Sequence, residues 1–188
     1  KQITAGEGGA VISNNKKLFA KIKKLKAFGI DTDIKDRKIP GLYNVKGLGY
    51  NFRMTDFQAA LLYTQIKRYN SKLKKRRDNA QIYENFLSDC KNINFSTFLD
   101  GNSYFIFQIF VDEKIRNNLI KKMVRNKIGC SIHYATPIPY FEYYKKSHNK
   151  RFKNAEKYAN TNISLPVYPD LKKEQIRYIS NFLIENLK

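Results

Sequence analysis

Residues 49–61 read GYNFRMTDFQAAL, and they join a turn-rich segment to the start of a helix. Thr55 or Asp56 is a favourable N-cap, because a side-chain oxygen there can accept a hydrogen bond from the first helical turn. Small and apolar residues recur after the cap at helical spacing, namely Phe57, Ala60 and Leu61. The sequence therefore predicts a strong helix from this point, with helical character continuing past a kink or break at Asn70-Ser71.

The residues before this stretch predict a shorter helix and a long loop. Asn14 or Asn15 can cap a helix that Gly29 ends, and its apolar stripe is Leu18, Ile22 and Leu25. Before the cap, residues 10–12, which end in the β-branched pair Val11-Ile12, predict a short strand that follows a glycine-rich turn. Residues 31–49 are polar and turn-rich, so they predict a long loop of the kind that is usually functional or mobile.

Beyond Cys90 the pattern changes to strands interspersed with helices. Strands or extended pieces are predicted at residues 93–95, 104–111, 128–134 and 163–167. Amphipathic helices are predicted at residues 113–126, 154–160 and 172–187, and the buried face of the last is Ile176, Ile179 and Leu183. A mainly helical front, residues 1–90, is thus expected to precede a small α+β module, residues 91–188.

The chain is strongly basic, with 36 Lys and Arg residues against 16 Asp and Glu and a net charge of +20. Such a balance can mark a module that binds nucleic acid or an acidic partner. The basic residues are dispersed, however, which favours a compositional bias towards lysine and makes a nucleic-acid partner the weaker hypothesis. A third interpretation is that part of the charge meets the phosphates of a small anionic substrate. Residues 72–77, which are densely basic, are expected to form a solvated or partner-facing helix surface.

Composition also narrows the class of protein. Apolar residues make up 42% of the chain and aromatic residues 14%, which indicates a folded protein with a real core. No apolar run is long enough to predict a transmembrane helix, and the first residues lack the layout of a signal peptide. Cys90 and Cys130 show neither metal-ligand nor disulfide spacing. We therefore expect a cytoplasmic protein with no metal site and no membrane partner.

Four stretches, in order along the chain, carry a family resemblance. They are KQITAGEGGAVI at residues 1–12, GYNFRMTDFQAAL at 49–61, GCSIHY at 129–134, and SLPVYP at 164–169 with EQI at 174–176. Together they resemble the DegT/DnrJ/StrS-type sugar aminotransferases. The second stretch is the most specific, because it is close to the family pattern GYNxRMTDxQAAL.

The resemblance implies an α/β protein of fold type I, the aspartate aminotransferase-like class that depends on pyridoxal 5′-phosphate. This chain would supply the end of the large domain and the small C-terminal α+β domain. It further implies a homodimer with shared active sites, L-glutamate as the amino donor and a nucleotide-linked keto sugar as the acceptor. Such enzymes would serve amino-sugar and surface-polysaccharide biosynthesis.

The resemblance also assigns roles to individual residues. Lys1 matches the lysine that binds the cofactor covalently. Asn51 matches the asparagine that reaches the cofactor phosphate of the neighbouring subunit, and Arg53 lies beside the same shared site. His133 and Tyr134 match positions near the substrate.

These residue types suit the chemistry that the resemblance implies. A lysine amine can condense with the cofactor aldehyde, and the freed amine can then act as a general base at the Cα atom of the amino donor. Asparagine offers neutral N–H donors to a phosphate, and arginine offers a planar fork of donors that fits phosphate or carboxylate.

Plainer interpretations stand beside these assignments. Asn51 and Arg53 precede a helix and could serve to cap it, and His133 at a strand end could be a structural histidine. Phe28-Gly29 replaces a His-Gly pair often found in the family. The part of the family pattern before Lys1 holds further cofactor contacts, so we expect this stretch to be an inactive fragment when alone. A catalytically silent relative of the family is a further alternative.

Overall fold

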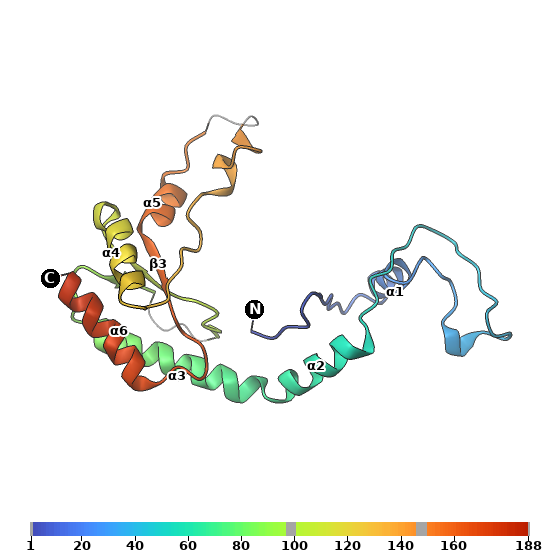
Figure 1. The fold of residues 1–188 in the computed structure, drawn as a ribbon. Helices are drawn as coiled ribbons and strands as arrows, with labels where there is room; N and C mark the ends of the chain where they lie inside the picture. The colour runs from blue at the N-terminus through green and yellow to red at the C-terminus, as the bar shows by residue number, and fades with distance from the viewer. Residues whose placement is uncertain (1, 97–100, 146–149, 188) are drawn as a thin grey trace. The chain divides into compact units, whose positions relative to one another are not determined.

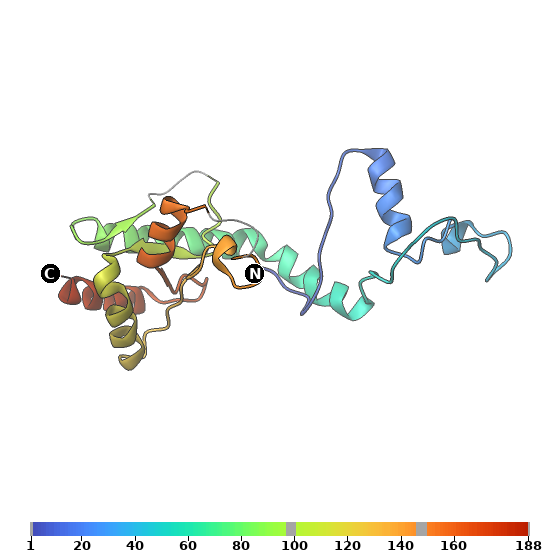
Figure 2. The same ribbon diagram turned by 90° about the horizontal axis from the view of Figure 1, so that it is seen from above.

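The computed structural model describes residues 2–96, 101–145 and 150–187 (Figures 1 and 2). Lys1, the predicted cofactor lysine, lies outside the described residues. The chain divides into two compact units, residues 1–68 and 69–188. The predicted division near residue 90 differs, because the helix before it packs within the second unit. The predicted assignment of the two parts to a large and a small aminotransferase domain stays a prediction.

The first unit contains two α-helices and a single turn of 3₁₀ helix. The elements are α1 (Lys16–Leu25), η1 (Ile34–Asp36) and α2 (Asp56–Lys67). The side chain of Asn15 caps α1 by accepting a hydrogen bond from the backbone N–H of Leu18 at 3.1 Å. Thr55 caps α2 in a reciprocal capping box with Gln58. Both caps satisfy N–H groups that the first helical turn leaves unpaired, which confirms the two predicted helix starts.

The second unit is an α+β module around a three-stranded antiparallel sheet of order β1-β2-β3. Its elements are α3 (Tyr69–Leu87), β1 (Asn94–Phe95), β2 (Phe107–Phe110), α4 (Glu113–Arg125), η2 (Ile138–Tyr140), α5 (Lys153–Thr161), β3 (Asn162–Leu165) and α6 (Lys173–Asn186). Helices α3 and α6 lie side by side (Figures 1 and 2). The predicted helices and the strand near 163–167 are thus confirmed in kind, with shifted ends.

The core of this unit joins α3 to the sheet. The ring of Tyr83 in α3 stacks on the ring of Phe107 in β2, with the ring centroids 5.0 Å apart. The predicted buried face of α6 is confirmed, because its three residues are almost fully buried, at 0–5% exposure: Ile176, Ile179 and Leu183. Burial of such aliphatic and aromatic surface is the main favourable contribution to folding, so α3 belongs with the second unit.

Two predicted strands are wrong among the described residues. Residues 10–12 form no strand. Of residues 128–134, Ser131 alone pairs, in an isolated bridge with Ser164 of β3. The strand predicted to begin at Tyr104 starts at Phe107 instead, because Tyr104 has a positive φ of 42° that interrupts extended backbone. The helix break falls at Arg68, just before the predicted site.

The predicted solvated helix surface at residues 72–77 is partly wrong. Arg76 is half-buried and donates a hydrogen bond to the carbonyl of Val167 at 3.1 Å, and burial lowers the pKa of its guanidinium. Arg77 Nε donates to the carbonyl of Asn102 at 2.9 Å. Two of the cluster's charges therefore tie α3 to neighbouring loops, since a long basic side chain can bury its stem and keep its donors satisfied.

Two buried tyrosines give opposite expectations for stability. The hydroxyl of Tyr83 has no hydrogen-bond partner among the described residues, whereas the hydroxyl of Tyr104 donates to the buried carboxylate of Glu84 at 3.0 Å. We expect Tyr83→Phe to leave the free energy of unfolding unchanged or to raise it by up to about 1 kcal/mol. Tyr104→Phe should lower it by about 1–3 kcal/mol, because the carboxylate loses its donor. Urea denaturation measures both, and equal destabilisation by the two variants would contradict the assignment.

Candidate functional site

The segment that carries Asn51 and Arg53 is held against the C-terminal end of α1. The backbone N–H of Tyr50 donates to the carbonyl of Leu25 at 2.7 Å, and that of Phe52 donates to the carbonyl of Lys26 at 2.9 Å. These carbonyls lie where a helix leaves its own acceptors unpaired. The end of α1 therefore fixes the backbone on both sides of Asn51.

Two glycines make this close approach possible. A Cβ atom on Gly49 would lie 1.9 Å from the backbone nitrogen of Gly29, and one on Gly29 would lie 2.1 Å from the carbonyl oxygen of Gly47. Gly29 also has a φ of +71°, in the left-handed region that glycine adopts without strain. No other residue type fits at these two positions without moving the backbone.

Asn51 and Arg53 lie together and are both exposed. Arg53 Nε donates to Asn51 Oδ1 at 3.2 Å, and the Arg53 guanidinium lies over the ring of Phe28, 5.1 Å from its centroid. The residue that departs from the family pattern thus supports the arginine through a cation–π contact. Thr55 and Gln58 cap α2, so the structure does not support the interpretation of Asn51 and Arg53 as helix caps.

Two glutamines of α2 hold the segment that follows Lys1. Gln65 pairs with the backbone of Thr4 in both directions: its Oε1 accepts from the Thr4 N–H at 3.0 Å, and its Nε2 donates to the Thr4 carbonyl at 2.7 Å. Gln58 Nε2 donates to the carbonyl of Glu7 at 2.9 Å. Residues seven apart share one face of a helix. The seven-residue spacing of Gln58 and Gln65 is visible in the sequence, but their role was not predicted from it.

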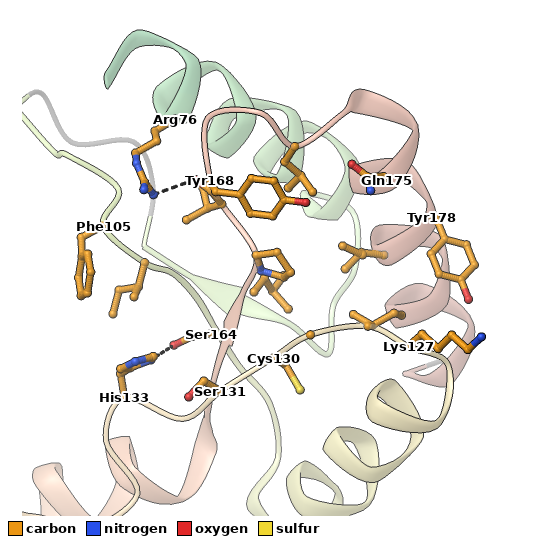
Figure 3. Close-up of a pocket in the computed structure, with 18 of the residues that line it drawn as sticks. Arg76, Phe105, Lys127, Cys130, Ser131, His133, Ser164, Tyr168, Gln175 and Tyr178 are labelled. Atoms are coloured by element: carbon orange, nitrogen blue, oxygen red, sulfur yellow. Dashed lines mark hydrogen bonds between the residues drawn. The ribbon is translucent and has the colours of Figure 1, made fainter. Parts of the chain in front are cut away.

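In the second unit His133 lines a cavity of about 760 Å³ (Figure 3), and Tyr134 follows it in the chain. The cavity is bounded by the segment around Ser131, by β3 and the proline-rich turn after it, and by α6. His133 Nδ1 is hydrogen-bonded to Ser164 Oγ at 2.8 Å, and the ring of Tyr134 meets the His133 ring edge-on. Tyr134 is exposed, and His133 places a polar ring in the lining of a largely apolar hollow, as ligand sites do.

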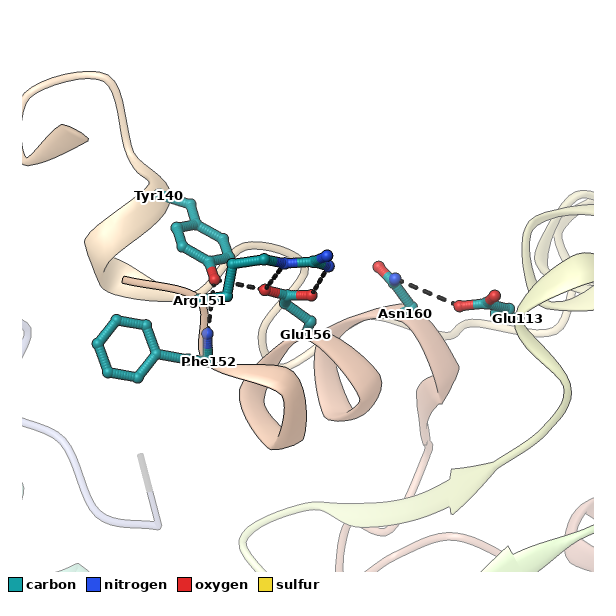
Figure 4. A network of polar contacts seen from close by, with 6 residues as sticks. All are labelled: Glu113, Tyr140, Arg151, Phe152, Glu156 and Asn160. Atoms are coloured by element: carbon teal, nitrogen blue, oxygen red, sulfur yellow. Dashed lines mark hydrogen bonds and ion pairs between the residues drawn. The ribbon is translucent and has the colours of Figure 1, made fainter. Parts of the chain in front are cut away.

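A compact polar cluster, here termed the clamp, closes the loop that follows this pair (Figure 4). Arg151 Nη2 and the hydroxyl of Tyr140 both donate to the Glu156 carboxylate, each at 2.5 Å. The Tyr140 oxygen in turn accepts from the backbone N–H of Phe152 at 2.8 Å. The sequence analysis missed the clamp, because Tyr140 and Arg151 come from opposite ends of a loop.

The structure therefore brings the predicted residues together as two pairs. Asn51 and Arg53 form one pair in the first unit, and His133 and Tyr134 form the other in the second unit. In the part of the chain that the structure describes, no helix is both long enough and apolar enough to span a bilayer.

Comparison with known proteins extends these observations. The profile of the DegT/DnrJ/EryC1/StrS aminotransferase family matches residues 1–184. The UDP-4-amino-4,6-dideoxy-N-acetyl-beta-L-altrosamine transaminase of Campylobacter jejuni subsp. jejuni serotype O:23/36 (strain 81-176) is 30% identical over 196 residues, which cover 100% of this chain and 50% of that protein. The spore coat polysaccharide biosynthesis protein SpsC of Bacillus subtilis (strain 168) is 28% identical and is matched over 94% of this chain and 48% of its own length.

A solved structure agrees with the sequence relatives. Helicobacter pylori PseC, an aminotransferase involved in the biosynthesis of pseudoaminic acid, superposes with a TM-score of 0.90 at 26% identity and is matched over 100% of this chain and 50% of that chain. The predicted fold class and family resemblance are therefore confirmed. The chain spans about half the length of the curated relatives it matches.

The glutamine contacts predict a local change in backbone dynamics. In Gln65→Leu the backbone N–H of Thr4 loses its acceptor, so its hydrogen exchange should quicken by about 2- to 10-fold, the value of one neutral hydrogen bond. Exchange at the Thr4 amide, followed by NMR, measures this. Thr64→Ala, on the adjacent residue, is the control and should leave the rate unchanged. Equal rates in the two variants would show that Gln65 does not hold the segment.

The clamp predicts a carboxyl group that stays ionised in acid. Hydrogen bonds from Arg151 and Tyr140 hold the pKa of Glu156 down at about 2. The clamp's contribution to stability is therefore present above the ordinary glutamate pKa of about 4.3 and is lost as the pH falls towards 2. We expect Arg151→Ala to raise the pKa of Glu156 towards the ordinary value, as measured by carboxyl ¹³C NMR titration. Lys150→Ala is the matched control, and an unmoved pKa in Arg151→Ala would refute the assignment.

Proposed function

Because the chain belongs to the DegT/DnrJ/EryC1/StrS aminotransferase family, we propose that it forms half of a pyridoxal 5′-phosphate-dependent aminotransferase. The enzyme would move an amino group from L-glutamate to a nucleotide-linked keto sugar. The observation that carries this proposal is the donor pair Asn51–Arg53, fixed on the end of α1 within the same unit that anchors the segment following Lys1. The Campylobacter relative is a UDP-amino-sugar transaminase and the Helicobacter relative is an aminotransferase of pseudoaminic acid biosynthesis, which supports a sugar acceptor.

The residues present fit the cofactor. The side chains of Asn51 and Arg53 are exposed, and one hydrogen bond joins them through Asn51 Oδ1 and Arg53 Nε. Among the described residues, no hydrogen bond is made by the side-chain N–H groups of Asn51 or by the terminal nitrogens of Arg53, although the guanidinium lies over the Phe28 ring. Neutral and cationic donors side by side suit a phosphate. We infer that they hold the cofactor phosphate across a dimer interface.

Lys1 would bind the cofactor covalently through Nζ. The cofactor supplies an aldehyde that captures amines and a ring that accepts electrons. Once released, the Lys1 amine would take the proton from the Cα atom of L-glutamate and, in the second half of the reaction, return a proton to the former keto carbon of the sugar. The Gln58 and Gln65 contacts serve this role by fixing the backbone that leads to the lysine.

His133 and Tyr134 would contact the nucleotide sugar. His133 lines the cavity (Figure 3), and the exposed Tyr134 packs against its ring. The net charge of +20 would favour the approach of a diphosphate-bearing substrate, because the summed field of a protein raises the local concentration of opposite charge. A diphosphate-bearing substrate would thus account for the basic charge, and the proposal requires no nucleic-acid partner.

The first unit carries an apolar surface that a partner must cover. Neither α1 nor α2 contains a buried residue. The large apolar side chains that are more than half exposed in this unit are Val11, Ile12, Phe19, Ile34, Ile39, Leu42, Tyr43, Leu48, Phe52, Phe57, Tyr63 and Ile66. Exposed apolar surface on this scale marks an interface. We propose that the rest of the aminotransferase fold and a second copy cover it, and that this half alone is inactive.

Substitution of Lys1 tests the proposed function. In the protein with its complete fold, Lys1→Ala should abolish the visible absorption of the bound cofactor and transaminase activity with L-glutamate. Arg53→Ala should weaken cofactor binding about 10- to 100-fold, because one charged hydrogen bond contributes about 1.5–3 kcal/mol.

Lys17→Ala, an exposed lysine of α1, is the control and should retain both signals. A cofactor absorption band that survives in Lys1→Ala would overturn the assignment of the lysine. A complete protein that shows no band with added cofactor would overturn the proposed function as a whole.

A further inference from the structure

His133 is held by three separate polar contacts, although it lies in a segment without regular secondary structure. Its backbone N–H donates to Asn162 Oδ1 at 3.0 Å, and its carbonyl accepts from Gln108 Nε2 at 2.8 Å. Its ring nitrogen Nδ1 pairs with Ser164 Oγ at 2.8 Å. We call Gln108, Asn162 and Ser164 the cradle. A residue needed only for packing would not require contacts at both its backbone and its ring.

The register of the sheet assembles the cradle. Gln108 of β2 lies opposite Ser164 of β3, and Phe110 lies opposite Asn162. Paired residues, and residues two apart in a strand, project from the same face of a sheet. The three cradle side chains therefore share one face, and the segment of His133 crosses that face beside the Ser131–Ser164 bridge.

Two of the three cradle residues are buried, and their polar groups are hydrogen-bonded. Asn162 is 0% exposed and Ser164 is 4% exposed. The Asn162 amide nitrogen donates to the carbonyl of Tyr158 at 2.7 Å, and the Tyr158 hydroxyl donates to Gln108 Oε1. Buried polar groups stabilise a fold only when they are satisfied. The network therefore leaves His133 a single backbone position.

The hydrogen bond between Ser164 and His133 also bears on which ring nitrogen of His133 carries the proton. A serine hydroxyl can donate one hydrogen bond, and in the described residues His133 Nδ1 is the one partner of Ser164 Oγ. If Nδ1 carried the proton, the buried hydroxyl hydrogen would have no acceptor, at a cost of about 1–3 kcal/mol. When the imidazole carries one proton, donation from the hydroxyl to Nδ1 satisfies both groups and leaves that proton on Nε2.

We propose that Ser164 is a positioning residue that sets this tautomer, so that His133 presents Nε2–H as a hydrogen-bond donor at the rim of the cavity (Figure 3). The ligand class that fits a single oriented N–H donor is an oxygen acceptor, and the inference rests on the proposed function for its identity. In that setting the acceptor is a diphosphate oxygen of the nucleotide sugar.

Nitrogen NMR of the full-length protein tests the tautomer directly. His133 and His148 are the histidines of this sequence, and a His133→Asn variant identifies the signals of His133. In mildly alkaline solution, two-bond ¹H–¹⁵N correlations should show that Nε2 is protonated and that Nδ1 is unprotonated. Ser164→Ala should shift the ring towards a mixture of tautomers, Ser164→Thr should restore the single form, and Ser131→Ala at the same rim should leave the tautomer unchanged.

Titration with uridine diphosphate tests the ligand. The His133 signals should shift on binding, and Ser164→Ala should weaken that binding about 5- to 10-fold, the value of a neutral hydrogen bond that is no longer aligned.

Protonated Nδ1 in the unmodified protein would overturn the inference even if the Ser164 variants failed to fold, and so would a tautomer indifferent to Ser164→Ala. If the His133 signals do not shift when uridine diphosphate is added, the assigned ligand is wrong. If the unmodified complete protein shows no transaminase activity, the proposed function fails, but the tautomer assignment is unaffected. The two failures are therefore distinguishable.

Discussion

The register of β2 against β3 governs the second unit, because one set of pairings arranges two different surfaces. Phe107 lies opposite Leu165, and Ile109 lies opposite Ile163, and these four side chains enter the core. The alternate pairs place Gln108, Asn162 and Ser164 on the other face, under His133. A slip of one residue would exchange the faces. It would put amides in the core and aliphatic side chains where the histidine now finds its partners.

The first unit is built on a different basis. It has almost no core, and its order comes from helix caps, from glutamine contacts to the backbone and from the contact between Gly29 and Gly49. Such contacts fix local geometry with high precision, but they remove little apolar surface from water. The unit thus places Asn51 and Arg53 accurately and depends on further protein for its burial.

The sequence predicted the parts of this molecule that have a periodic or local signal. The helices followed from apolar spacing and from Asn15 and Thr55 as caps, and the donor pair followed from the motif at residues 49–61. The cradle and the clamp could not be predicted, because Gln108, Ser164 and Arg151 meet their partners only through strand register or loop closure. The strand predicted at 128–134 failed for a related reason. Ile128 and Cys130 line the cavity and pack in or against the core, and a single bridge at Ser131 is all the pairing that this segment makes.

The clamp has a consequence for how such a protein can diversify. Because Tyr140 and Arg151 both engage Glu156 of α5, the chain leaves and rejoins the module at one fixed point. Closing a flexible loop twice as long costs only about 0.6 kcal/mol more. Residues can thus be inserted or deleted between Tyr140 and Arg151 with little penalty to folding, so this segment can evolve in length and character while the sheet stays constant.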